Sequence, residues 1–139
     1  MEKEINRLNK SRYLPVSIIV TDMDKFKEIN DKFGHKIGDI ALKITASIIE
    51  DAVGEEDIVA RLGGDEFAVI LPGADQKTAA GVCKEIERRI EEYNKNSKIK
   101  IAVSTGYATR DDSATGLDKV LIEADKMMYR NKRAKQADN

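Results

Sequence analysis

The chain has little cysteine and almost no net charge. It contains one cysteine, Cys83, among 139 residues, and its formal net charge is −1 at pH 7. One cysteine excludes an internal disulfide and a cysteine-based zinc site, and it agrees with a reducing compartment. A charge near zero offers no electrostatic footprint for a nucleic-acid duplex, and the basic cluster at 130–135 is typical of a solvated helix end. We therefore expect no nucleic-acid partner.

Long apolar runs are also missing. The longest, Ile18-Ile19-Val20, is short enough for a strand, and the N-terminus, Met1-Glu2-Lys3-Glu4, is too charged for a signal peptide. These features predict a cytoplasmic chain without membrane contact. Hydrophobic residues make up 41% and charged residues 35% of the sequence, the balance of a single globular domain of ordinary size.

Strand and helix patterns alternate along the chain. Helices are predicted over Glu2 to Ser11, from Phe26 to Phe33 with Gly34 as the end, from about Ile37, over Gln76 to Asn94, and around 117–128. Strands are predicted at 16–21, 57–62, 67–71 and, half buried, from Ile99 to Tyr107. Strands that alternate with helices but include a hairpin indicate an α/β fold, with a central mixed sheet flanked by helices.

The most informative segment is the run Arg61-Leu62-Gly63-Gly64-Asp65-Glu66-Phe67, which lies between two apolar runs. Its glycines fall where a hairpin must reverse. Glycine permits a positive φ in a tight turn, and without a Cβ it lets a phosphate approach the backbone. Asp65 and Glu66 then lie at the tip or at the start of the outgoing strand. A purely structural hairpin needs no second acid, so these carboxylates are candidates for contact with a ligand.

A third carboxylate, Asp22, ends the first predicted strand. If that strand neighbours the outgoing strand of the hairpin, Asp22 and Asp65 meet at one edge of the sheet and would form a magnesium site suited to phosphoryl or nucleotidyl transfer. The spacing alone allows an equally good structural interpretation, in which Asp22 caps a helix and Asp65 is a turn residue.

A longer pattern favours the metal site. The segment from Asp22 to Asp39, together with Gly63-Gly64-Asp65-Glu66-Phe67, closely resembles the GGDEF family, the diguanylate cyclases, and the similarity extends from about Val16 to Lys132. The resemblance implies one GGDEF catalytic domain over 1–139, with a palm-type fold shared with nucleotidyl cyclases and some polymerases. It also implies that two GTP-loaded domains face each other as a homodimer, condense two GTP into cyclic di-GMP and release two pyrophosphates.

The resemblance implies a catalytic and metal-binding set. Asp22, the backbone carbonyl of Met23, and Asp65 would hold two Mg²⁺ ions, which Mn²⁺ could replace, and Glu66 would share metal or base duties. Asp65 would also accept the proton of the attacking 3′-hydroxyl. Lys27 would reach the triphosphate, where a cation offsets the charge that develops in the transition state.

The resemblance implies a GTP-binding set as well. Asn30 and Asp39 would read the guanine edge, because an acidic side chain accepts from the N1–H and N2–H₂ donors of guanine. His35 would face the substrate or, equally, stabilise its own loop, and Lys132 would bind phosphate or simply be a cation at a helix end. The remaining residues expected beside GTP are Phe26, Gly63 and Gly64.

Some features depart from the family pattern. Before the first strand, the family's Leu-Thr-Gly-Leu turn with the Asn-Arg pair that follows it is absent, which predicts a truncated catalytic domain of a longer protein with a sensory domain. Gly54 stands where the family's inhibitory Arg-x-x-Asp site has arginine, with Asp57 in place, and glycine cannot make the bidentate contact of arginine. Lys135-Gln136 replaces the usual Gly-Arg pair, so Lys135 could substitute for one triphosphate contact. The alternative function is a catalytically weak or inactive GTP-binding module that acts as a sensor or scaffold.

Overall fold

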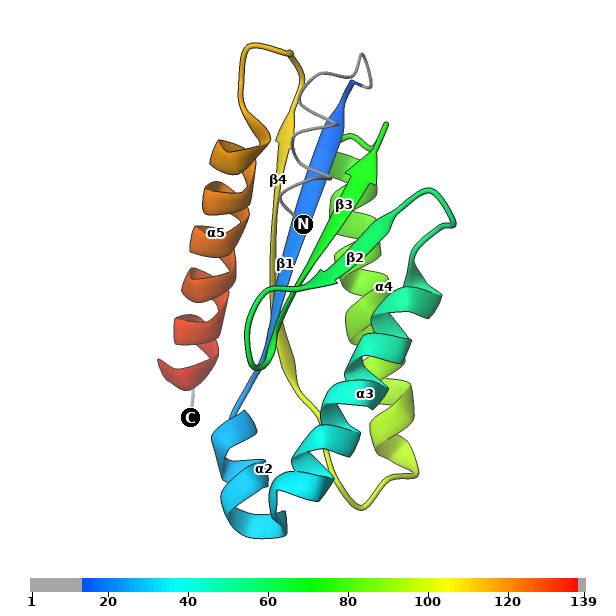
Figure 1. Ribbon diagram of the computed structural model, residues 1–139, viewed down its shortest axis with the longest axis vertical. Coiled ribbons are helices and arrows are strands. Elements are labelled where there is room, and N and C mark those ends of the chain that lie inside the picture. The colour runs from blue at the N-terminus through cyan, green and yellow to red at the C-terminus, as the bar shows by residue number, and fades with distance from the viewer. Residues whose placement is uncertain (1–13, 138–139) are drawn as a thin grey trace.

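The computed structural model describes residues 14–137 (Figure 1). The helix expected over Glu2 to Ser11 lies outside these residues. No helix in the described part is both long enough and apolar enough to cross a membrane. The elements, in chain order, are β1 (Val16–Met23), α2 (Phe26–Phe33), α3 (His35–Ala52), β2 (Ile58–Arg61), β3 (Glu66–Pro72), α4 (Gln76–Lys95), β4 (Val103–Arg110) and α5 (Leu117–Ala137).

The four strands form one sheet in the order β2-β3-β1-β4, and each neighbouring pair is antiparallel. β1 is central and all eight of its residues are buried, as its nearly continuous apolar sequence predicts. Because β3 and β4 both run antiparallel to β1, the end of β1 lies between their beginnings. Asp22 is thereby placed opposite Glu66 on one side and opposite Ser104 on the other.

Helices cover both faces of the sheet, which confirms the predicted α/β fold with a central sheet flanked by helices. The prediction of a mixed sheet is wrong, because all neighbouring pairs among the described strands are antiparallel. On one face Ile19 and Met23 belong to a core built with α2, α3 and α4, and on the other face Val16, Ile18 and Val20 pack against α5. Of the described helices, only α5 lies on its side of the sheet in Figure 1. Successive side chains of a strand point to opposite faces, so Asp22 shares the α5 face with Val20.

The last strand begins later than predicted. β4 starts at Val103, so Ile99 and Ile101 lie outside it, although Ile101 is buried. The side chain of Asn94 accepts a hydrogen bond from the Ile101 N–H at 2.9 Å and donates one to the Ile101 carbonyl at 2.7 Å. These bonds satisfy the backbone of Ile101 without a neighbouring strand, and an alternating apolar pattern cannot distinguish the two arrangements.

Side chains of α5 cover the outer edge of β4. Met127 accepts a hydrogen bond from the Tyr107 N–H, and Asn131 donates one to the Thr105 carbonyl at 2.7 Å. Lys135 donates to the carbonyl of Val103. From one contact to the next, the residue number rises by four on the helix and falls by two on the strand, because the two elements run in opposite directions. Four helical residues and two extended residues span similar lengths, so the contacts stay in step. This pairing fixes the position of α5 along the sheet and protects an edge strand.

Candidate active site

The diglycine segment forms the predicted hairpin between β2 and β3. The Leu62 N–H donates to the Glu66 carbonyl at 2.8 Å, and the Arg61 Nε donates to the carbonyls of Gly63 and Gly64 at 2.9 and 3.1 Å. The expectation of a positive φ at these glycines is wrong, since the described glycines with positive φ are Gly34 and Gly73. The wider turn, held by the Arg61 side chain, reverses the chain without it. A Cβ at either glycine would meet nothing within 4 Å, so the backbone there is open to approach.

The carboxylates of Asp22 and Asp65 come together where β1 ends. The Met23 N–H donates to the Asp65 carbonyl at 3.1 Å, which fixes the hairpin tip beside β1. Burial, followed by the negative charge of Asp22, raises the pKa of Asp65 above its usual range. The sheet therefore brings together the two acids that the sequence placed 43 positions apart in different strands.

Lys132 reaches this pair from α5. Its Nζ is 2.7 Å from Asp22 Oδ2 and 3.2 Å from the Met23 carbonyl oxygen. Burial by itself would lower the pKa of Lys132, but the hydrogen bond to Asp22 and the charges of Asp22 and Asp24 outweigh it and raise that pKa. The side chain is therefore an ammonium ion paired with Asp22, which is more specific than a solvated cation at a helix end.

Glu66 lies on the α5 face next to residues that the sequence analysis did not single out. Burial, then a hydrogen bond with Asp125 and the charge of Asp125, raise the pKa of Glu66 to about 7. The charge of Glu66 is in turn the main cause of a raised pKa at Tyr129. Asp125 and Tyr129 are four residues apart on α5, a spacing that puts two side chains on one helix face. That spacing was visible in the sequence, but the strand that it faces was not.

Asp24 is the other group that the sequence analysis did not assign. The Ser104 hydroxyl donates to Asp24 Oδ1 at 2.7 Å, and Lys135 Nζ lies 3.1 Å from Asp24 Oδ2. Lys135 thus contacts a carboxylate beside the site, whereas the sequence suggested a triphosphate contact for it. The run Asp22-Met23-Asp24 contained the signal, because Asp24 directly follows the end of β1 and is only two residues from Asp22.

The predicted guanine-reading and phosphate-binding residues of α2 and α3 form a separate group. Phe26 and Asn30 pack against Gly38, where a Cβ would lie 1.8 Å from Asn30 Oδ1. Lys27, His35 and Asp39 are exposed. Asp39 lines a hollow of about 340 Å³ together with Arg61 and Phe67, between α3 and the hairpin. Among the described residues, no hydrogen bond or ion pair links this group to Asp22 or Asp65, and the hollow at Asp39 adjoins only the hairpin that carries Asp65.

The oxygen donors at the end of β1 supply only part of the coordination shell that a divalent cation needs. Among residues 14–137, no group of three or more His, Cys, Asp or Glu side chains is arranged to hold a metal ion. Asp22 Oδ1 is nevertheless buried without a hydrogen-bond partner within the described residues. The Asp22 carboxylate lies close to that of Asp65, and it shares the Lys132 ammonium group with the Met23 carbonyl. Magnesium commonly takes one or two carboxylates and completes its coordination with water and substrate phosphates. The donor set therefore fits Mg²⁺ bound together with a phosphate-bearing substrate.

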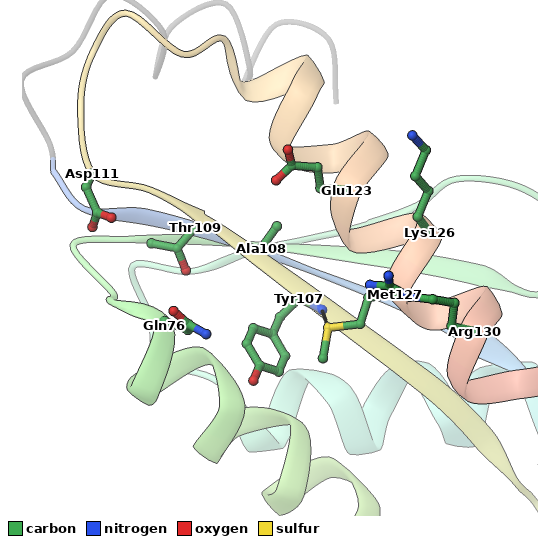
Figure 2. A pocket seen from close by; sticks show the side chains of 9 residues that line it. All are labelled: Gln76, Tyr107, Ala108, Thr109, Asp111, Glu123, Lys126, Met127 and Arg130. Atoms are coloured by element: carbon green, nitrogen blue, oxygen red, sulfur yellow. Dashed lines mark hydrogen bonds between the residues drawn. The ribbon is translucent and has the colours of Figure 1, made fainter. Parts of the chain in front are cut away.

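A second hollow lies away from these acids. It has a volume of about 400 Å³ between β4, α5 and the start of α4, and Figure 2 shows Tyr107, Met127 and Arg130 around it. None of the residues predicted for catalysis, metal binding or GTP binding lines this hollow. The candidate active site is therefore the acidic end of the sheet.

The domain has an antiparallel sheet between helical layers, and carboxylates and a lysine gather at the end of its central strand. These features define an α/β domain of the palm type. A family model described as "Diguanylate cyclase, GGDEF domain" matches residues 1–138. The chain belongs to the GGDEF family.

Curated relatives agree with this assignment. Diguanylate cyclase A of Treponema denticola is 34% identical over 120 residues, which are 84% of this chain and 32% of that protein. The probable diguanylate cyclase DgcF of Escherichia coli K12 is 32% identical over 133 residues, 91% of this chain and 42% of the relative. The chain thus spans about a third to two fifths of the length of these relatives.

Solved structures share the fold. The GGDEF domain of DgcB from Caulobacter crescentus, in complex with c-di-GMP, is 28% identical with a TM-score of 0.87, over 96% of this chain and 82% of that one. The active GGEEF domain of a diguanylate cyclase from Vibrio cholerae is 27% identical with a TM-score of 0.79, over 96% and 83%.

Proposed function

We propose that this domain condenses two molecules of GTP into cyclic di-GMP, with release of two pyrophosphates. The observation that carries the proposal is the gathering of Asp22, the Met23 carbonyl, Asp65, Glu66 and Lys132 at one end of the sheet, in a chain of the GGDEF family. The c-di-GMP complex of the Caulobacter relative supports the same product chemistry.

Asp22, the Met23 carbonyl and Asp65 would hold the magnesium, with Glu66 beside them. Bound there, the metal would neutralise phosphate charge and stabilise the attacking and leaving oxygens of nucleotidyl transfer. The chain's own groups do the rest in this proposal. Asp65 accepts the proton of the 3′-hydroxyl, since its raised pKa makes it a better base than an ordinary aspartate.

Substrate selection belongs to α2 and α3 in this proposal. Asn30, next to Gly38, and Asp39 contact the guanine, while Lys27 and Lys132 contact phosphate oxygens; Phe26, His35, Gly63 and Gly64 border the bound nucleotide. The Oδ1 atom of Asn30 is buried and lacks a partner within the described residues, so it has an unused acceptor for a donor such as a guanine N–H.

The product contains two phosphodiester bonds, and the described residues of one domain, 14–137, hold one such acidic site. We therefore propose that catalysis occurs between two GTP-loaded domains in a homodimer. The reaction of an untethered domain should be slow at low protein concentration, because each GTP-loaded domain must then bind a second one from solution. Linking two copies in one chain should raise the activity per domain, and unchanged activity after linkage would contradict the dimer model.

The decisive experiment is chromatography of nucleotides after incubation of concentrated protein with GTP and Mg²⁺. We expect cyclic di-GMP from the wild type and from Asp51→Asn, an exposed carboxylate on α3, and none from Asp65→Asn. Magnesium-dependent GTP binding without product, at all concentrations and in the linked dimer, would instead support a GTP-binding module that acts as a sensor or scaffold.

A further inference from the structure

The ammonium group of Lys132 lies on two oxygens that the proposed metal site would use. Its Nζ contacts Asp22 Oδ2 at 2.7 Å and the Met23 carbonyl oxygen at 3.2 Å. The side chains of Lys132 and Asp22 are 18% and 11% exposed, so water screens this contact weakly. A divalent cation on the same oxygens would face a positive charge at close range, and like charges at such distances repel strongly in a partly buried site.

A second carboxylate stands next to the same ammonium group. Asp24 Oδ1 lies 3.8 Å from Lys132 Nζ, which is close enough for an ion pair and too far for a hydrogen bond. Ser104 and Lys135 hold the two oxygens of Asp24 in place, and its side chain is 13% exposed. A movement of about 1 Å would bring Lys132 into hydrogen-bond distance of Asp24.

We propose that Lys132 competes with the divalent cation for Asp22, and that Asp24 is the positioning residue that receives Lys132 when a cation binds. The exchange keeps Asp22, Asp24 and Lys132 paired, because Asp22 passes from the ammonium group to the metal while Lys132 passes to Asp24. The inference rests on the proposed function only for the location of the metal ligands. By linkage, the Lys132–Asp22 contact weakens cation binding by the same factor by which a bound cation weakens that contact.

The first test measures the binding of Mn²⁺ alone, without nucleotide, from the electron paramagnetic resonance signal of the free ion. Lys132→Met should bind Mn²⁺ at least about fivefold more tightly than the wild type. Lys132→Arg, which keeps the charge, should restore wild-type affinity. Lys126→Met, which removes one charge from the same helix at the hollow of Figure 2, should bind like the wild type.

Lys132→Gln serves as a second neutral variant, and circular dichroism identifies any variant that fails to fold. Equal or weaker Mn²⁺ binding by the neutral variants would overturn the competition. So would the absence of binding by every variant, because removal of the competitor must leave Asp22 available. Activity is not measured here: a chain that shows these affinity ratios but makes no cyclic di-GMP would refute the proposed function and leave the competition standing.

The role of Asp24 is tested by a double-mutant cycle. Asp24→Asn should weaken Mn²⁺ binding when Lys132 is present, because Lys132 then remains on Asp22. The same substitution in the Lys132→Met background should weaken binding by a clearly smaller factor. An equal factor in both backgrounds would show that Asp24 acts as a general negative charge, and it would overturn its assignment as a positioning residue.

Discussion

Gly106 is the point where the packing of β4 against α5 leaves no room for a side chain. A Cβ at this position would lie 2.3 Å from the Ala124 carbonyl oxygen, 2.3 Å from the Met128 nitrogen and 2.9 Å from the Met127 carbonyl carbon. All three are backbone atoms of a helix, so no rotamer change can relieve the overlap. The substitution Gly106→Ala would force α5 away from the sheet by about 1 Å to reach ordinary contact distances.

The cost of this displacement can be estimated from the packing. Overpacking of a well-packed core costs typically 1–3 kcal/mol, and obstruction by backbone puts this case at about 3 kcal/mol. For a domain of this size, 1 kcal/mol corresponds to about 3–4 °C in melting temperature, so we expect Gly106→Ala to melt about 10 °C below the wild type. The same displacement moves Lys132 on α5 away from Asp22 on β1.

Thermal and urea unfolding measured by circular dichroism check this prediction. The matched control is Gly81→Ala, an exposed position inside α4 where a Cβ would meet nothing within 4 Å. Alanine should stabilise that helix by about 0.5–1 kcal/mol. If Gly106→Ala melted within about 2 °C of the wild type, the close packing of α5 on β4 described above would be refuted.

Three further predictions concern other positions. In Gly38→Ala the new Cβ displaces Asn30, so the KM for GTP should rise more than kcat falls, and an unchanged KM would contradict a role of Asn30 in binding guanine. Burial raises the pKa of Cys83 to about 12, so at pH 8 its thiol stays protonated and should react with a thiol reagent only after unfolding in urea; rapid reaction of the folded protein would disprove this. Added cyclic di-GMP should leave the initial rate unchanged, because the inhibitory site of the Arg-x-x-Asp type is incomplete in this chain. Glycine replaces its arginine at position 54, and its aspartate, Asp57, accepts a hydrogen bond from the Gly54 N–H at 2.8 Å. Inhibition gained in Gly54→Arg, but absent from the wild type, would agree with that assignment, and inhibition of the wild type would refute it.

The sequence predicted the elements well where a local pattern determines them. The buried run of β1, the end of α2 at Gly34 with its φ of 90°, and the apolar stripe of α4 all depend on residues within one or two turns of each other. The prediction was wrong at Ile101, where the Asn94 side chain satisfies the backbone, and at the diglycine turn, where Arg61 holds a wider loop. In both cases a single side chain replaced the expected backbone pattern.

The candidate site was partly predictable for a similar reason. The segments around Asp22 and Asp65 identified the family, and the signature residues themselves indicated carboxylate chemistry. The sequence analysis assigned no role to Asp24 and Asp125, because the role of each depends on a residue of another element that lies next to it in the fold. Asp24 gains its role from Ser104 on the neighbouring strand, and Asp125 from Glu66 on β3.

The sequence by itself determined the order of strands and helices, the hairpin and the family, since these follow from patterns over short distances along the chain. Only the tertiary structure decided that Asp22 faces α5 and that Lys132, 110 residues later, pairs with it. The physical reason is that the antiparallel register of β1 with β3 and β4, and the close contact of α5 at Gly106, arise from burying whole faces of the sheet at once. The local conformational preferences of β1 and α5 do not determine that Asp22 and Lys132 lie together.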